Sequence, residues 1–135
     1  MANESTYTQA LLPELRRAGW IVDKLSDQFT AGIPDVAVTF NKTTVWLELK
    51  EIDKNYSEIT KSRNYKLQMH ENKKRAKWGR CYYVVHRQNV GVVEFWDPVE
   101  LEQYLEKNED ASPWDGARAR DWPTIIGIIE ELAQL

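Results

Sequence analysis

The sequence predicts an α/β protein, with a mixed sheet of about five strands flanked by helices. Two short runs of β-branched and aromatic residues, 36–40 and 45–49, are separated by the turn-forming residues 41–44 and predict a hairpin. A third apolar run, 81–86, predicts a central strand and follows a helical segment that Gly79 ends. Strands that alternate with helices in this way are typical of a sheet covered by helices.

The first elements precede the hairpin. Residues 5–18 have apolar side chains at helical spacing and predict a helix that stops at Gly19. Pro13 removes a backbone hydrogen bond, so we expect this helix to be kinked or divided into two pieces. A strand is expected to begin at Trp20, followed by a polar loop over residues 26–32.

Past the hairpin, the polar stretch 51–61 predicts a mobile loop, and residues 62–78 predict a helix. The strand at 81–86 is followed by another at 90–96. Asp97-Pro98-Val99-Glu100 predicts the start of a helix, as a capping box with proline in the first turn.

The C-terminal part consists of a loop over residues 108–116 and a last helix that starts at Asp121. This helix carries a strongly apolar face, for which two interpretations stay open: packing on the core, or contact with a second copy of the chain. Its apolar residues are Ile125, Ile126, Ile128, Ile129 and Leu132.

Length and composition indicate one soluble domain that spans residues 1–135, with a motif core at about 20–87 and a C-terminal strand and helices at about 88–135. The chain is 42% hydrophobic and 29% charged, and no run approaches the roughly 18 apolar residues of a membrane helix. No secretory signal pattern is present, so we expect a cytoplasmic protein. The lone Cys81 excludes an internal disulfide and is expected to be a buried strand thiol.

Charge is distributed unevenly along the chain, although the net charge is only −3. Residues 42–87 carry twelve Lys and Arg against five Asp and Glu, whereas residues 88–135 carry three against eleven. A positive middle segment of this kind is expected of a protein with one face against phosphate groups. The alternative is that the basic helix simply presents a solvated surface.

Three charged residues lie on the otherwise apolar hairpin: Asp35, Glu48 and Lys50. Side chains two apart on a strand point the same way, so Glu48 and Lys50 share one face. Charged groups are rarely buried in a sheet unless they are paired or bind a metal, so this set predicts a divalent-metal site beside an amine. A purely structural alternative has Asp35 capping a turn, while Glu48 and Lys50 pair on an exposed edge strand.

Pro34-Asp35, a twelve-residue gap and then Glu48-Leu49-Lys50 resemble the PD-(D/E)XK nuclease signature. Together with Gly32 and with Gln68 on a later helix, the pattern is most similar to virus-type replication-repair nuclease (VRR-NUC) domains and archaeal-type Holliday junction resolvases. The resemblance implies a restriction-endonuclease-like fold and hydrolysis of DNA phosphodiester bonds. It also implies that Asp35, Glu48 and the Leu49 carbonyl hold Mg²⁺, for which Mn²⁺ could substitute.

Catalytic roles implied by the resemblance fall on Asp35, Glu48, Lys50 and Gln68, with Lys50 acting on the attacking water and Gln68 orienting Lys50 or the phosphate. Related nucleases often add a polar residue from the first helix, for which Glu4, Gln9 and Glu14 are candidates. Neither His70 nor His86 has a partner in sequence that indicates a catalytic base. Expected phosphate contacts are Lys61, Arg63, Lys66, Lys73, Lys74 and Lys77.

The sequence therefore predicts a Mg²⁺-dependent DNA endonuclease that selects branched or junction DNA, with DNA and a second copy of the chain as expected partners and no organic cofactor. Three alternatives stay open. The first is a sequence-specific restriction or homing nuclease on the same core, and the second is a nucleic-acid-binding module that does not cut. The third is an interaction protein that binds a partner through its acidic tail and C-terminal helix.

Overall fold

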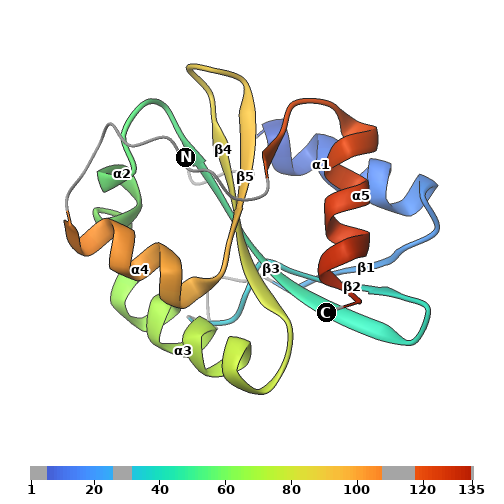
Figure 1. Ribbon diagram of the computed structural model, residues 1–135, viewed down its shortest axis with the longest axis horizontal. Helices are drawn as coiled ribbons and strands as arrows, with labels where there is room; N and C mark the ends of the chain where they lie inside the picture. Colours follow the sequence, from blue (N-terminus) through green and yellow to red (C-terminus); the bar gives the residue numbers. More distant parts are fainter. Residues whose placement is uncertain (1–5, 26–31, 108–117, 135) are drawn as a thin grey trace.

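A six-stranded sheet with helices on both faces forms the centre of the protein (Figure 1). The structure is a computed structural model and describes residues 6–25, 32–107 and 118–134. In chain order the elements are α1 (Thr6–Arg17), β1 (Ile21–Lys24), β2 (Val36–Phe40), β3 (Thr43–Ile52), α2 (Ser57–Thr60), α3 (Tyr65–Trp78), β4 (Cys81–Arg87), β5 (Val92–Trp96), α4 (Pro98–Lys107), β6 (Arg118–Ala119) and α5 (Trp122–Leu132).

Strands lie in the sheet in the same order as in the chain, β1 to β6. Only β3 and β4 pair in parallel, because α2 and α3 connect them; the other neighbouring strands are antiparallel. The prediction of an α/β protein with a mixed sheet flanked by helices is confirmed. The expected number of about five strands agrees with β1 to β5, and the two-residue β6 adds an edge strand that is too short to give a sequence signal.

The hairpin between β2 and β3 is tighter than expected. Asn41 and Lys42 have φ values of 52° and 67°, so the turn has two residues in the left-handed region, as in the type I′ turns that suit a hairpin. The predicted four-residue turn is wrong, since Thr44 already pairs with Thr39 across the strands. Their hydroxyl oxygens lie 2.9 Å apart. As a result β3 is ten residues long and extends past Lys50.

Helix α1 is continuous, so the predicted division at Pro13 is wrong. Pro13 and Gln9 are both exposed, which allows solvent to reach the carbonyl that loses its intrahelical partner. The opposite side of the helix is apolar, and Leu11 and Leu15 are completely buried there. Burial of this face against the sheet offsets the cost of the proline.

The segment after β3 is ordered rather than the predicted mobile loop. It contains the short helix α2, and the Glu58 carboxylate accepts hydrogen bonds from the backbone N–H groups of Asp53, Lys54 and Asn55. These bonds lower the pKa of Glu58. The following helix, α3, starts at Tyr65 rather than at residue 62.

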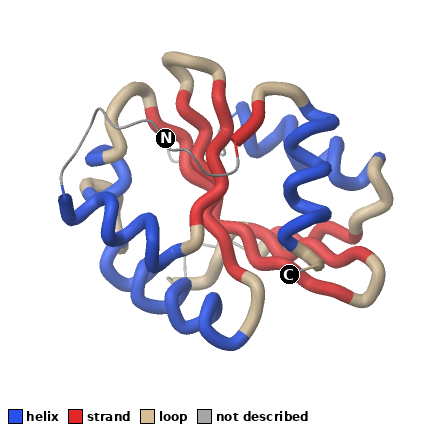
Figure 2. The backbone as a smooth tube through the Cα atoms, in the orientation of Figure 1, coloured by secondary structure: helices blue, strands red, loops and turns tan. Residues whose placement is uncertain are grey.

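Two apolar clusters lie on opposite faces of the sheet, as the layers in Figure 2 show. The larger cluster joins α1 and α5 to one face and includes Leu47 and Val84. The smaller cluster joins α2, α3 and α4 to the other face and includes Met69, Tyr83 and Trp96. Alternation along β3 therefore places odd-numbered residues such as Leu47 and Leu49 toward α1 and α5, and Glu48 and Lys50 toward α3.

The C-terminal helices start where the sequence predicted. Asp97 accepts hydrogen bonds from the N–H groups of Val99 and Glu100 at the start of α4, and Asp121 accepts one from Thr124 at the start of α5. Ile125 and Ile129 of α5 are buried in the larger cluster, so packing on the core is the interpretation confirmed for this helix. The predicted loop 108–116 lies outside the described residues.

Two smaller expectations also have an outcome. Cys81 is buried on β4, which confirms the expected buried strand thiol, and burial raises the pKa of this thiol to about 12. Among the helices of the described residues, none has the length and apolar character needed to cross a membrane.

Candidate active site

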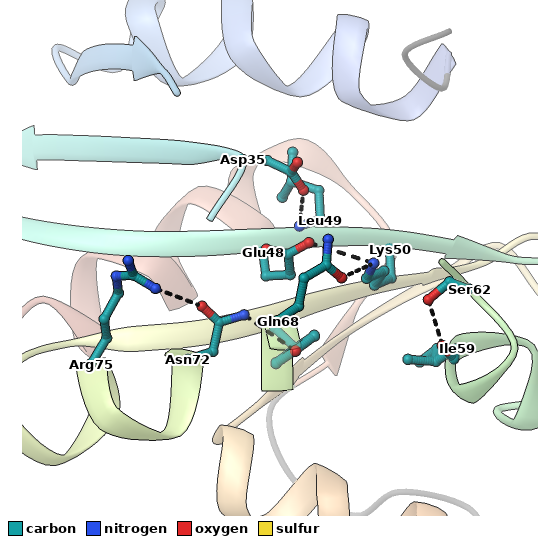
Figure 3. A network of polar contacts seen from close by, with 10 residues as sticks. Asp35, Glu48, Leu49, Lys50, Ile59, Ser62, Gln68, Asn72 and Arg75 are labelled. Atoms are coloured by element: carbon teal, nitrogen blue, oxygen red, sulfur yellow. Dashed lines mark hydrogen bonds and ion pairs between the residues drawn. The ribbon is translucent and has the colours of Figure 1, made fainter. Parts of the chain in front are cut away.

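Glu48, Lys50 and Gln68 meet between the sheet and α3 (Figure 3). Asp35 lies next to Glu48, against the Leu49 amide. Asp35 lies just before β2, and because Val36 pairs with Leu47, it sits beside Glu48 of β3. Lys50 is two residues further along β3, on the same face as Glu48. Gln68 reaches the same place from the sheet-facing side of α3. The four predicted catalytic residues thus come from three separate segments of the chain.

Glu48 is buried to 1% exposure, although it carries a carboxyl group. Its Oε2 lies 3.5 Å from the Lys50 ammonium nitrogen, and its Oε1 is also buried, with no hydrogen-bond donor among the described residues. A buried carboxyl oxygen without a donor costs free energy of folding, on the order of 1–3 kcal/mol. The structural alternative of an exposed edge strand is wrong, because β3 lies between β2 and β4 in the sheet interior.

The carboxyl groups of Asp35 and Glu48 both titrate above their ordinary range. Burial raises the pKa of Glu48 to about 8, and the neighbouring Asp35 charge adds to the rise, while Lys50 and the nearby Asn72 side chain oppose it. Burial also raises the pKa of Asp35, against the effects of the Leu49 amide and Lys50. Two carboxylates this close repel each other unless a proton or a cation lies between them.

Hydrogen bonds fix both the acidic and the basic part of the site. The Leu49 N–H donates to Asp35 Oδ2 at 2.8 Å, which holds the carboxylate against β3. The Lys50 ammonium donates to Gln68 Oε1 at 2.9 Å, which aims it along the face that Glu48 occupies. The role of the Leu49 carbonyl as a metal ligand stays a prediction, because Leu49 contacts Asp35 through its N–H group and not through its carbonyl.

These residues fit a hard divalent cation. Mg²⁺ is commonly bound through one or two carboxylates, with water and substrate oxygens at its other positions. Asp35 and Glu48 supply such a pair, and the buried Glu48 Oε1 has the missing partner that a cation would provide. Within the described residues, no group of three or more His, Cys, Asp and Glu side chains could hold a metal, so a closed transition-metal site is not what the chain offers there.

Arg75 and Asn72 extend the site along α3, and the sequence analysis did not name them as site residues. Arg75 donates to the Gly32 carbonyl at 2.8 Å, and its guanidinium lies 5.9 Å from the centre of the Trp46 ring. Asn72 is completely buried and donates to the Tyr83 hydroxyl at 3.2 Å. Both lie on the sheet-facing side of α3 with Gln68, four and seven residues after it. This helical spacing is the sequence signal that could have identified them.

Gly32 closes the loop against α3. Its φ of 89° is in the region that favours glycine, and an added Cβ would come within 3.1 Å of Glu71 and 3.4 Å of Leu67. Helix α3 therefore approaches Gly32 closely, through the Glu71 and Leu67 side chains. Together with the Arg75 hydrogen bond, this contact fixes the position from which Pro34 and Asp35 enter β2.

Residues of α1 are not brought to this site. The helix packs on the opposite face of the sheet, where Gln9 is exposed and Glu14 pairs with Arg17. Glu4 lies outside the described residues. His70 is exposed, and His86 Nδ1 lies 3.1 Å from Glu51 Oε1. Glu51 follows Lys50 on β3, so its side chain is on the opposite face of the sheet from Glu48 and Lys50.

The predicted phosphate contacts lie on and before α3 but do not all remain available. Lys73 is half-buried and its ammonium lies 2.6 Å from Glu102 of α4. Lys74 pairs with Glu71 at 3.4 Å, in an exposed arrangement that solvent weakens. The exposed members of the set are Lys61, Arg63, Lys66, Lys74 and Lys77.

Comparison with known proteins gives matches to solved structures alone. No protein-family model matches the chain, and no curated protein matches it. Eleven chains of solved structures match. One is the 1.6 Å structure of Hjc from Archaeoglobus fulgidus, a Holliday junction resolvase from an archaeal hyperthermophile. The similarity covers 69% of this chain and 70% of that one, at 14% sequence identity and a TM-score of 0.47.

Proposed function

We propose that this protein is a divalent-metal-dependent DNA endonuclease that hydrolyses phosphodiester bonds in branched DNA. The observation that carries the proposal is the buried Glu48 beside Asp35, next to a lysine whose ammonium Gln68 holds in place. A fold under no functional constraint rarely retains two adjacent carboxyl groups with raised pKa values in its sheet. Burial of such groups costs stability, so their presence indicates a use.

Each residue has a role in this proposal. Asp35, Glu48 and the Leu49 carbonyl would hold Mg²⁺, or Mn²⁺ in its place; the bound ion supplies charge neutralisation at the phosphate and a more acidic water. Lys50 would stabilise the negative charge that builds on the phosphate and orient the attacking water. Gln68 would keep the Lys50 ammonium pointed at that position, as its 2.9 Å hydrogen bond does here.

Branched DNA is the proposed substrate because of the sequence resemblance to junction resolvases and VRR-NUC domains. The exposed lysines of α3 could bind phosphates without reading bases, which suits recognition of DNA shape. A four-way junction offers two symmetric strands, so we also propose that two copies of the chain act together. Sedimentation of the protein with and without a junction would measure this association.

The test is cleavage of an end-labelled four-way junction and of a linear duplex with the same arm sequence, in Mg²⁺ or EDTA. The proteins are wild type, Asp35→Ala and, as a matched acidic control, Asp53→Ala, whose exposed side chain lies outside the site. We expect Mg²⁺-dependent cutting of the junction by wild type and by Asp53→Ala, and none by Asp35→Ala.

Other outcomes discriminate the alternatives. Equal cutting of both DNAs would retain the nuclease and remove the branch preference, and a single cut site in plasmid DNA would indicate a sequence-specific enzyme. Binding that is equal in Mg²⁺ and EDTA, with no cutting even in Mn²⁺, would contradict the proposal and indicate a binding module.

A further inference from the structure

The outward face of α3 combines positive charge with one large aromatic side chain. Lys66, Lys74 and Lys77 are exposed there, and Lys61 and Arg63 precede the helix. Trp78, the last residue of α3, is 83% exposed. By contrast, Trp20 and Trp96 are exposed by only 3% and 1%, and Trp46 and Trp122 are half-buried, so Trp78 is the most exposed tryptophan in the described part of the chain.

The exposed Trp78 ring lies beside a positive charge. The Lys77 ammonium nitrogen lies 5.2 Å from the centre of the ring, within the range of a cation–π contact. Gly79 follows, and having no side chain it covers no part of the ring. The charged and aromatic groups needed to bind a phosphate and a base are therefore adjacent in the sequence Lys77-Trp78-Gly79.

Trp78 belongs to the side of α3 that borders the candidate active site. Leu67, Glu71, Lys74 and Trp78 follow one another at spacings of four, three and four residues, which places them along one flank of the helix. Gly32, in the loop that carries Asp35, approaches this flank at Glu71 and Leu67. The other flank faces α4, through the Lys73–Glu102 ion pair, and Figure 1 shows the two helices side by side.

Distance along the helix relates Trp78 to the site. Ten residues separate it from Gln68, and at 1.5 Å per residue the axial distance is about 15 Å. A stacked DNA strand rises about 3.4 Å per nucleotide, so this distance corresponds to roughly four or five nucleotides. A strand whose phosphate lies at Lys50 could therefore follow the lysines of α3 and place a base near Trp78.

We propose that Trp78 stacks on an unpaired DNA base, while the lysines of α3 bind the phosphates between this base and the Asp35–Lys50 site. The inference rests on the proposed function, because that function is the reason for choosing DNA as the ligand. It adds that the part of the substrate near Trp78 is single-stranded. An unpaired base is required because a ring can stack only on a base face that no neighbour covers. A protein partner is a poorer fit: only Leu67 joins Trp78 as a large exposed apolar side chain on this flank, among charged groups.

The test measures binding in EDTA, where cleavage is not required. Fluorescence anisotropy would follow a labelled twelve-nucleotide oligo-dT strand and a blunt DNA hairpin of equal charge, with wild type, Trp78→Ala, Trp78→Phe and Ile21→Ala. Ile21 is a matched control, since it is 64% exposed and lies on the edge strand β1. Circular dichroism would verify that all variants are folded.

We expect Trp78→Ala to weaken binding of the single strand about ten-fold, with little change for the hairpin, because base–aromatic stacking is lost. Trp78→Phe should retain most of the affinity, and Ile21→Ala all of it. Single strands of three nucleotides are too short to span from the Asp35–Lys50 site to Trp78. If they contact only the lysines of α3, they should bind wild type and Trp78→Ala equally.

Equal binding of the twelve-nucleotide strand by wild type and Trp78→Ala would overturn the inference, as would a lack of DNA binding. A change in sedimenting mass on Trp78→Ala, with DNA affinity unaltered, would overturn it in favour of a contact between copies. If Trp78→Ala binds single-stranded DNA as wild type does and the protein cleaves DNA, the proposed nuclease function stands and the stacking role of Trp78 is contradicted. If binding depends on Trp78 but the protein does not cleave DNA, the stacking role stands and the nuclease function is contradicted.

Discussion

The two faces of β3 differ in chemistry although they are equally inaccessible to solvent. Leu47 and Glu48 are neighbours in the chain and are exposed by 0% and 1%. Leu47 joins the apolar cluster with α1 and α5, where each buried methylene favours the folded state. Glu48 faces α3 and carries a carboxyl oxygen without a hydrogen-bond donor among the described residues. Leu47 therefore stabilises the fold, whereas burial of the Glu48 carboxyl group reduces its stability.

Lys50→Met removes the positive charge beside Glu48 and should have a large effect on activity. We expect the cleavage rate to fall about 10²- to 10⁴-fold, the usual contribution of a positioned proton-transfer or charge-stabilising group. Mg²⁺ affinity should remain within a few-fold of wild type, because the carboxylates stay in place. Single-turnover cleavage and calorimetric titration with Mg²⁺ measure the two quantities.

Lys54→Met is the control for that prediction, since Lys54 follows β3 with an exposed side chain. Its rate should equal that of wild type. A Lys50→Met enzyme that cuts at the wild-type rate would show that the polar face does not act through Lys50.

Leu47→Ala should have the opposite profile, on the apolar face of the same strand. Removal of a completely buried leucine side chain costs about 2–5 kcal/mol of the free energy of unfolding, because a cavity is left behind. At a temperature where the variant is folded, its cleavage rate should stay close to wild type. Urea unfolding measures the stability, and a rate loss as large as that of Lys50→Met would contradict the division between the faces.

Arg75→Met should have a smaller effect, because Arg75 contacts the loop before Asp35 and does not reach the carboxylates in the described contacts. Loss of its hydrogen bond to the Gly32 carbonyl should loosen the entry to β2. We expect Mg²⁺ affinity or the cleavage rate to fall about 10- to 100-fold, as for groups that orient metal ligands. Saturating Mg²⁺ should restore most of the rate, and no restoration would indicate direct contact with DNA.

Much of the fold followed from local patterns in the sequence. Alternation on β3 predicted that Glu48 and Lys50 share a face, and helical spacing placed Gln68, Asn72 and Arg75 on one side of α3. These periodicities are local properties, so they survive folding largely unchanged. The start signals at Asp97 and Asp121 were reliable for the same reason.

Features that depend on distant contacts were not predicted. Arg75 contacts Gly32 across 43 residues of sequence, and no local pattern specifies such a pair. The strand β6 has two residues and exists because β5 offers it an edge. The segment after β3 is ordered because the Glu58 carboxylate accepts hydrogen bonds from three backbone N–H groups within it. The polar composition of this segment alone indicated a mobile loop.

The buried carboxyl group of Glu48 should also make the stability of the protein depend on pH. In the folded state burial raises the pKa of Glu48 from its ordinary value of 4.5 to about 8. The folded state therefore binds more protons than the unfolded state between these values, so its stability is fully present below pH 4.5 and is lost as pH rises toward 8. A divalent cation between the carboxylates would reverse this loss, because it binds the folded state.

The most direct test of the metal site is urea unfolding of wild type and Glu48→Gln at pH 5 and pH 8, each in EDTA and in Mg²⁺. In EDTA we expect wild type to be less stable at pH 8 than at pH 5, and Glu48→Gln to lose less over the same range. Mg²⁺ should stabilise wild type at pH 8 and leave Glu48→Gln nearly unchanged. If Mg²⁺ stabilises both proteins equally or neither of them, Asp35 and Glu48 do not form a metal site.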